Sequence, residues 1–444
     1  MAETDRAKRR RPLVSLYETI AGDEDARACK DIPEGACRAQ PRNFVVHLVA
    51  NTLSKIGDEL ASARLVLAWL LSALGAPATF AGFLVPIRES GSLLPQLFVA
   101  ASIRRRAIRK GFWVLGSALS GIAVAGMAIT ALTLEGAAAG WAIIALLIVF
   151  ALSRGINSVA SKDVLGKTIA KQRRGTVMGY AASAAGFFTL ALGGYLTLAS
   201  LDDAGAGLFV ALLAASAGAW WIAAAVFARL HEDPGATEGG VNGFGEALRS
   251  LRLLWADRAF GHFVLTRALL MSTALALPFY VLLAEAATEG ALATLGLLIL
   301  ASGLASALSA PVWGRMSDRS ARGVLVVAGL LATLLGFVVA LGSWFAPAAS
   351  GLLDMGWVHA VLFFLLGISH AGVRLGRKTY LVDMATQETR AAFTAVSNTV
   401  IGVLLLVGGL FGLLAQLAGT EFAIFVLALM SLAGALSAWR MKEV

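Results

Sequence analysis

Long apolar runs of about 20 residues or more recur along most of the sequence. A helix of this length crosses the hydrocarbon core of a bilayer, which is ~30 Å thick. Only 15% of the 444 residues are charged, too few to cover the surface of a soluble protein of this length. The chain is therefore predicted to be an all-α polytopic membrane protein, since helices satisfy their own backbone groups in lipid.

We count twelve predicted spans, in two groups of six around one long polar connector. The first group covers residues 44–74, 77–102, 111–133, 138–161, 174–200 and 206–230. The second group covers residues 259–286, 290–313, 322–346, 355–383, 390–418 and 420–440. The predicted domains are thus an N-terminal tail (1–43), an N-terminal six-helix half (44–230), a linker (231–258) and a C-terminal six-helix half (259–440).

The charges of the predicted loops alternate from one side of the membrane to the other. Loops on one side carry arginines and lysines, among them Arg106, whereas loops on the other carry acidic residues such as Asp203 and Glu289 and neither Lys nor Arg. Basic loops stay on the cytoplasmic side. The tail, the linker and both termini are therefore predicted to be cytoplasmic, in a multi-pass protein of the inner membrane.

The sequence disfavours several other classes of protein. The net charge of +9 does not indicate nucleic-acid binding, because the basic residues lie in short loops between apolar runs. No G-x-x-x-x-G-K-[ST], H-E-x-x-H or TVGYG pattern occurs, so ATP-driven transport, metal-dependent hydrolysis and a potassium-type filter are not expected. Neither an enzyme nor a cofactor or metal is predicted, and Cys29 and Cys37 are interpreted as free thiols.

Several polar and ionisable residues fall inside the first span, where a charge costs about 3 kcal/mol or more unless it faces a cavity or a partner. One helical face carries Asn51, Lys55, Asp58, Glu59, Ser62 and Trp69. Lys55 and Glu59 are spaced to form a local ion pair. Asp58 has no such local partner, and burial of an unpaired carboxylate favours its protonated form, so Asp58 is the better candidate for proton exchange. Arg64 points the opposite way, with no partner that can be named.

Further charges occupy the second, fourth, seventh and tenth spans. They are Arg88, Glu89 and Gln96, then Arg154 and Asn157, then Arg267, and finally His370 and Arg374. Arg377 and Lys378 lie closer to the cytoplasmic end of the tenth span, where snorkelling to the interface explains them. The predicted cavity thus contains Lys55, Arg88, Arg154, Arg267 and Arg374 against Asp58, Glu59 and Glu89. This excess of positive charge favours an anionic or zwitterionic substrate.

The loop between the eighth and ninth spans carries a motif, in the stretch Pro311-Val-Trp-Gly-Arg-Met-Ser-Asp-Arg-Ser-Ala-Arg322. Gly314, Asp318, Arg319 and Arg322 resemble the loop signature of the major facilitator superfamily, G-x-x-x-D-R-x-G-R, with Ala321 in place of the second glycine. A fainter copy stands 216 residues earlier, with the matching pairs Pro95 and Pro311, Arg106 and Arg322, Lys162 and Lys378, and Arg174 and Arg390. The resemblance implies two pseudo-symmetric six-helix halves that rock about a central site.

The fourth span carries a second resemblance to this family. Arg154-Gly-Ile-Asn157-Ser158 is similar to the motif R-x-x-Q-G, with Asn157 at the glutamine and Ser158 at the glycine. The resemblance implies that Arg154 holds Asp58 or Glu89 ionised until a proton or the substrate displaces it. In the fifth span, Thr189-Leu190 replaces the Gly-Pro of the family's antiporter signature, so antiport is not implied.

Together these observations predict a monomeric secondary active transporter that moves a small organic solute by alternating access, coupled to protons. The predicted proton-coupling residues are Asp58, Glu89 and Arg154. The predicted substrate cavity comprises Asn51, Lys55, Glu59, Arg88, Gln96, Asn157, Arg267, His370 and Arg374. The predicted cytoplasmic gate comprises Gly314, Asp318, Arg319, Arg322 and Arg174, with Asp318 against the start of the fifth span and Arg322 paired with Asp383 or Glu388. The alternative is a non-transporting scaffold, assembly or sensing protein on the same fold.

Overall fold

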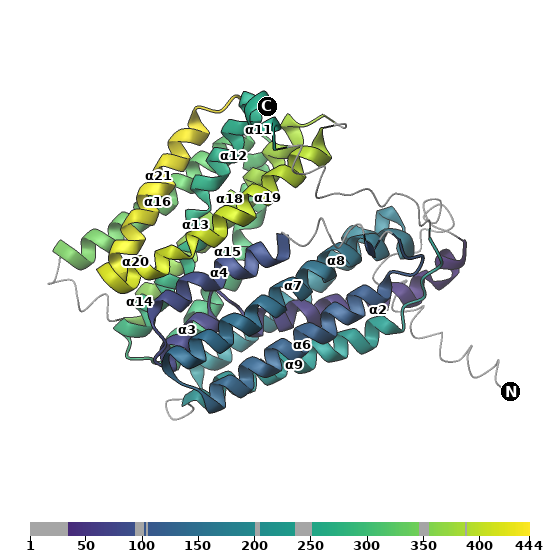
Figure 1. Ribbon diagram of the computed structural model, residues 1–444, viewed down its shortest axis with the longest axis horizontal. Coiled ribbons are helices and arrows are strands. Elements are labelled where there is room, and N and C mark those ends of the chain that lie inside the picture. The colour runs from purple at the N-terminus through teal and green to yellow at the C-terminus, as the bar shows by residue number, and fades with distance from the viewer. Residues whose placement is uncertain are drawn as a thin grey trace.

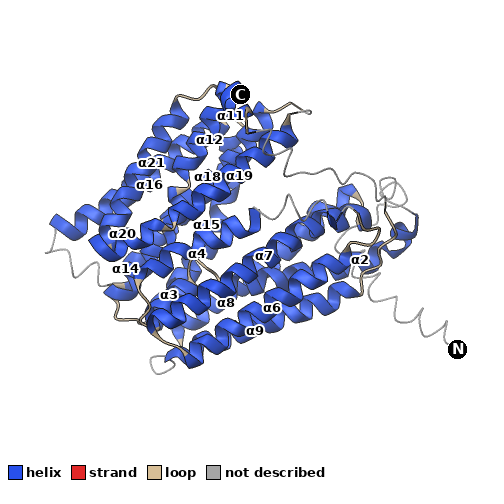
Figure 2. Ribbon diagram, viewed as in Figure 1, coloured by secondary structure: helices blue, strands red, loops and turns tan. Residues whose placement is uncertain are grey.

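The computed structural model describes residues 34–93, 102–103, 105–199, 205–235, 251–345, 355–386 and 389–444. Across these ranges the regular structure is entirely helical, as Figure 2 shows. Ten stretches of the described chain are long and apolar enough to cross a membrane. The predicted all-α membrane class is therefore confirmed, and the ten stretches coincide with the predicted third to twelfth spans. Five residues discussed above lie outside the described ranges: Cys29, Pro95, Gln96, Asp203 and Glu388.

The helices form two bundles in chain order. The first contains α2 (Glu34–Leu60), α3 (Val66–Ala73), α4 (Ala78–Leu93), α6 (Lys110–Thr133), α7 (Gly136–Thr168), α8 (Lys171–Leu198) and α9 (Gly205–Ala228). The second contains α11 (Leu253–Ala256), α12 (Arg258–Leu270), α13 (Ser272–Leu275), α14 (Leu277–Ala287), α15 (Leu292–Ser317), α16 (Ala321–Phe345), α18 (Gly356–Met384), α19 (Arg390–Gly408), α20 (Leu410–Ala418) and α21 (Thr420–Trp439).

The first predicted span is not one continuous helix, contrary to expectation. It begins earlier, at Glu34, and α2 ends at Leu60; residues 61–65 form a turn before α3 begins. An unbroken helix would place Trp69 on the charged face, but Trp69 is fully buried in an apolar core. Arg64, expected on the opposite face, instead lies in the turn and lines a cavity between the bundles. Because of the break, Trp69 lies in the apolar core and Arg64 faces the cavity, the reverse of what a continuous helix would give.

The seventh predicted span is also interrupted, into α12, α13 and α14. Asp257 caps α12 by accepting hydrogen bonds from the amides of Ala259 and Phe260, which satisfies two of the free N–H groups at its start. Pro278 stands in the first turn of α14, where its missing N–H costs no helical hydrogen bond. The short segments between these points carry residues that face the cavity, such as Met271 and Thr273.

The two bundles diverge toward one end and meet at the other, as Figure 1 shows. Where they meet, α3 and α4 of the first bundle lie against α14, α19 and α20 of the second, and α8 packs along α15. The diverging end carries the C-terminus and the basic segments before α6, before α8 and between α15 and α16. We call these the joined end and the basic end.

Small residues allow the backbones to approach at the joined end. A Cβ on Gly412 of α20 would lie 2.5 Å from the carbonyl oxygen of Thr79 and 2.8 Å from the Cα of Gly82 in α4. Close glycine contacts of this kind replace the hydrophobic driving force that is absent in lipid. Polar contacts add to them, because Ser72 Oγ donates to Glu285 Oε2 at 2.6 Å and Thr79 hydrogen-bonds Gln416.

Charged side chains tie the basic end of the first bundle together. Glu232, only 7% exposed, accepts hydrogen bonds from the amides of Arg109 and Lys110 at the start of α6, where a carboxylate complements the helix dipole. Its other partner is Lys167, whose Nζ lies 2.7 Å away. The start of the predicted linker is therefore anchored to its own half. Cys37 is disulfide-bonded rather than a free thiol, which corrects that expectation.

Candidate functional site

A cavity of about 400 Å³ lies between the two bundles. The first bundle contributes residues of α2, the following turn and α4, and the second contributes residues of α12 to α14, α18 and α19. Its charged lining consists of Asp58, Glu59, Arg64, Arg88, Glu89, Arg267, Arg374, Arg377 and Lys378. A cavity of this volume suits a small organic molecule.

Asp58 is the centre of an ion-pair network on the first bundle. Arg88 Nη2 of α4 lies 2.9 Å from Asp58 Oδ1, and Arg154 Nη2 of α7 lies 2.6 Å from Asp58 Oδ2. One carboxylate thus links three helices with both of its oxygens. Two bonded guanidinium groups favour the ionised form of a carboxylate. Asp58 therefore has partners after all, and they come from helices that local spacing could not reveal.

The guanidinium of each of these two arginines also lies over an aromatic ring. The guanidinium of Arg154 lies 4.6 Å from the ring centroid of Trp220, and that of Arg88 lies 5.2 Å from that of Phe150. Cation–π contacts at such distances stabilise a partly desolvated guanidinium. Of the two partners that the family resemblance implied for Arg154, Asp58 is the one that it bonds in this structure.

Three residues predicted for the substrate cavity do not line it. Asn51 is buried and donates to the carbonyl of His47 one turn earlier, at 2.8 Å. Asn157 is buried against α6, where its Nδ2 lies 3.3 Å from Ser117 Oγ. Lys55 is absent from the cavity lining and does not form the expected ion pair with Glu59. Periodicity in the sequence groups residues on one face of a helix but does not say which of them face the cavity and which pack against neighbouring helices. The two asparagines are of the second kind.

The other described residues of the predicted substrate cavity do line it, whereas Arg154, also counted among the cavity charges, does not. Glu59, Arg88, Glu89, Arg267, His370 and Arg374 face the space between the bundles. Arg377 and Lys378, interpreted above as reaching the interface, also line the cavity. We call Arg267, Arg374, Arg377 and Lys378 the C-half cationic cluster.

Arg267 is the member of this cluster with defined partners. Its Nη1 lies 2.5 Å from Ser397 Oγ and its Nη2 lies 2.9 Å from Asn398 Oδ1, both on α19. These partners are neutral, so they orient the guanidinium without cancelling its charge. His370 of α18 is held in a similar way, with its Nδ1 3.3 Å from Thr273 Oγ1. Neither pairing was predicted from the sequence, because the partner residues are small polar side chains on other helices.

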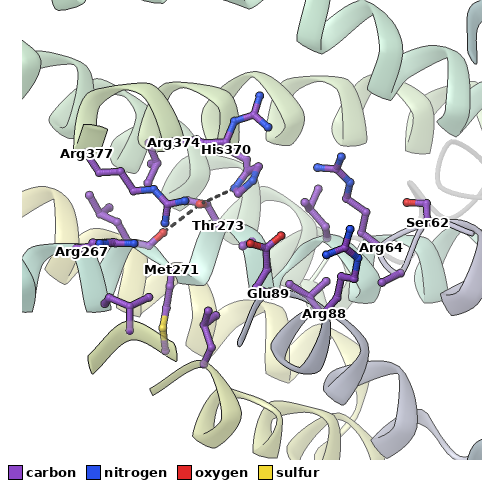
Figure 3. A pocket seen from close by; sticks show the side chains of 18 of the residues that line it. Ser62, Arg64, Arg88, Glu89, Arg267, Met271, Thr273, His370, Arg374 and Arg377 are labelled. Atoms are coloured by element: carbon purple, nitrogen blue, oxygen red, sulfur yellow. Dashed lines mark hydrogen bonds between the residues drawn. The ribbon is translucent and has the colours of Figure 1, made fainter. Parts of the chain in front are cut away.

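Glu89 is positioned differently from Asp58. Figure 3 shows its carboxylate projecting into the cavity, between Arg64 and Arg88 on one side and Arg267 and Arg377 on the other. It interacts electrostatically with three arginines of the C-half cationic cluster, Arg267, Arg374 and Arg377. No ion pair within 4 Å joins Glu89 to any of the described cations. It is thus a carboxylate close to several cations and bonded to none of them.

The predicted gate residues are not assembled in this structure. Asp318 and Arg319 are exposed at the end of α15, and Arg174 donates to the carbonyls of Ile169 and Gly166 within its own half. Arg322 pairs with Glu443 at 2.6 Å in this structure and not with Asp383. The basic end is open here, and a contact between α15 and the start of α8 requires that end to be closed.

Comparison with known proteins gives a consistent result. Residues 271–443 match the model of the Major Facilitator Superfamily. A D-xylose-proton symporter is similar in structure, with a TM-score of 0.68 at 13% identity over 90% of this chain and 97% of that one. The xylose transporter XylE from E. coli in an inward-open conformation gives 0.65 at 13% over 90% and 97%, and the nucleoside transporter NupG gives 0.66 at 12% over 89% and 99%. No curated protein sequence matches the chain.

Proposed function

We propose that this chain, which has the major facilitator fold and whose second half matches that superfamily, is a secondary active transporter of a small organic solute. The predicted fold and family resemblance are confirmed by the comparisons. The observation that carries the proposal is a charge-lined cavity between two bundles that are joined at one end and separated at the other. Such a cavity is a binding site that one membrane face can reach while the other cannot.

Alternating access requires contacts at the joined end that can break. The contacts there are glycine approaches, hydrogen bonds such as that from Ser72 to Glu285, and a buried apolar cluster to which both bundles contribute. Interfaces of this kind support rigid-body rocking of one half against the other. When the joined end opens, Asp318 would move toward the start of α8, which is how we propose that the predicted gate works.

We further propose that transport is coupled to protons through Glu89 and Asp58, with Arg154 as charge partner. Carboxylates that share a cavity with the substrate site link proton binding to substrate binding, because each changes the electrostatic environment of the other. Asp58 is held by ion pairs with Arg88 and Arg154, whereas Glu89 lines the cavity without an ion pair to a described residue. No cofactor is needed for this chemistry, and protons, the substrate and the lipid bilayer are the partners.

The alternative is a scaffold or sensing protein on the same fold. A scaffold has no requirement for charged residues in a cavity within the membrane, where each ionised group is costly. The nine charged residues that line the cavity therefore favour transport. The two functions make opposite predictions for solute flux.

Flux through proteoliposomes tests the proposal. The purified chain would be reconstituted with sugars, nucleosides, peptides, organic acids or phosphorylated compounds, each with and without an imposed pH gradient. We expect at least one solute to accumulate when the gradient is imposed and a protonophore to abolish this accumulation. The absence of flux for every member of the panel, in vesicles that contain folded protein, would favour the scaffold.

The proposed orientation places the basic end and both termini in the cytoplasm of the inner membrane, as the loop charges predict. A cysteine substituted at Glu289, in a chain lacking Cys29 and Cys37, should react with an impermeant maleimide added to intact cells. A cysteine at Arg106 should react only after the cells are permeabilised. Labelling of the Arg106 site in intact cells would overturn the orientation.

A further inference from the structure

The cavity lining is strongly unbalanced in charge. Its cations are Arg64, Arg88 and the four members of the C-half cationic cluster, against the three carboxylates Asp58, Glu59 and Glu89. Asp58 is already bonded to Arg88, and also to Arg154 behind the cavity wall. Five cations then remain for two carboxylates, which is an excess of three positive charges.

Two of these cations come from opposite halves and lie near one another. Arg64, in the turn after α2, and Arg374, on α18, line the cavity and also a small adjoining pocket. Their electrostatic interaction is repulsive, and neither forms an ion pair with a described residue. Figure 3 shows both side chains beside His370, with Arg377 on the same helix. Like charges in this arrangement are stabilised when an anion lies between them.

The open basic end lets water screen these charges in the present conformation. When the cavity closes during alternating access, water leaves and the cations lose this screening. Uncompensated charge in a desolvated cavity is strongly unfavourable. A bound solute that carries negative charge would offset this excess and lower the free-energy cost of closure.

We infer that the solute is an organic anion with two or more negative charges, carboxylate or phosphate, which binds between Arg64 of one half and Arg374 and Arg377 of the other. This inference rests on the proposed function and names the substrate class of the same cavity. Arginine suits both oxyanions, because its planar guanidinium donates two parallel hydrogen bonds to either of them. A zwitterion adds no net negative charge and leaves the excess unchanged.

Glu89 is the internal counter-ion that this anion displaces. Its charged neighbours are Arg88 on its own helix, Asp58, Glu59 and Arg64 at the end of α2, and the C-half cationic cluster with His370 on the second bundle. In the empty cavity the Glu89 carboxylate partly offsets the cluster. An anion that takes this place repels the Glu89 carboxylate and releases it from its interaction with the cluster.

Binding to the purified full-length chain in detergent tests the inference, with thermal unfolding as the readout. The probes are inorganic phosphate, pyrophosphate, succinate, citrate, glycerol 3-phosphate and glucose 6-phosphate. Succinamide, glycerol and glucose are the uncharged counterparts, and glycylglycine is the zwitterion. We expect a saturable rise of the unfolding temperature with at least one divalent or trivalent anion and none with the uncharged or zwitterionic probes. The phosphate and carboxylate probes show which oxyanion is preferred.

Variants make the test specific to the cavity. Arg374→Gln and Arg64→Gln should each weaken binding of that anion by about tenfold or more, the loss expected for one charged hydrogen-bonding partner. In the absence of ligand, each variant should have an unfolding temperature equal to the parent's or higher, because the repulsion between Arg64 and Arg374 has been removed. Glu89→Gln should bind the anion about fivefold more tightly or better, since the internal competitor is lost. Arg440→Gln, an exposed arginine on the same half, should bind as the parent does.

Three outcomes would overturn the inference: equal stabilisation by an uncharged or zwitterionic probe, equal loss in Arg440→Gln and Arg374→Gln, or no saturable response to any anion. The proposed function fails separately. Saturable anion binding without flux in proteoliposomes would retain the anion site and reject the transporter, whereas gradient-driven flux of an uncharged solute would retain the transporter and reject the anion.

Discussion

Asp58→Asn is expected to destabilise the protein by about 3 kcal/mol, as when one partner of a buried ion pair is removed. The substitution leaves Arg88 and Arg154 facing a neutral amide, although the parent carboxylate bonds both of them. Their side chains are 22% and 21% exposed, so water relieves only part of this repulsion. The unfolding temperature in detergent should fall clearly, and gradient-driven uptake should be lost while counterflow exchange continues in the protein that remains folded.

Two further variants separate the ion-pair network from a general effect of charge. Asp58→Asn combined with Arg88→Gln should recover part of the lost stability, because one of the two unpaired cations is removed. Glu59→Gln, the adjacent carboxylate with no ion pair, should change the unfolding temperature little. If Asp58→Asn unfolds at the parent's temperature, the three-helix network does not stabilise this fold.

Glu89→Gln is expected to abolish proton-driven accumulation while preserving exchange. Glutamine keeps the size of the side chain but cannot bind or release a proton, so the solute should equilibrate across the membrane and reach an accumulation ratio of about one. Counterflow should continue, because the cationic residues proposed to bind the solute are unchanged. The measurement is uptake into proteoliposomes under an imposed pH gradient, compared with exchange at equal pH on both sides.

The control for this variant is Glu135→Gln, an exposed acidic residue outside the cavity, which should accumulate the solute as the parent does. Normal uphill transport by both Glu89→Gln and Asp58→Asn would place the coupling carboxylate elsewhere in the chain.

Much of the fold could be predicted because its signals are local in the sequence. Apolar runs of spanning length and the sidedness of basic loops are independent signals. Together they predicted twelve spans, ten of which coincide with membrane-length helices of the described chain. The break at residues 61–65 could not be predicted in this way, since helical periodicity assumes that a helix continues. That assumption placed Trp69 on the charged face and Arg64 away from it, and the structure has the reverse.

The candidate site was less predictable than the fold. Charged residue types inside apolar runs identified Asp58, Glu89, Arg154 and Arg374 as unusual, because charge is costly in a membrane. Their partners come from distant helices, and nothing in the local spacing links Asp58 to Arg88 or Arg154. Asn51 and Asn157 were assigned to the cavity by face alone, and both instead donate hydrogen bonds to groups of their own half.

In the proposed mechanism the two halves rock, so that the cavity now open at the basic end becomes open at the joined end. Pulsed electron–electron spin resonance can measure this with two pairs of spin labels on exposed positions. One pair, at Lys171 of α8 and Arg315 of α15, spans the basic end; the other, at Leu198 of α8 and Leu417 of α20, spans the joined end.

We expect a second population in each pair on titration with protons and the stabilising anion, shorter across the basic end and longer across the joined end. The two changes should occur together, since a rigid-body motion moves both ends at once. A single, unchanged distance in both pairs, in protein that still binds the anion, would contradict alternating access and leave the cavity as the binding site of a sensor.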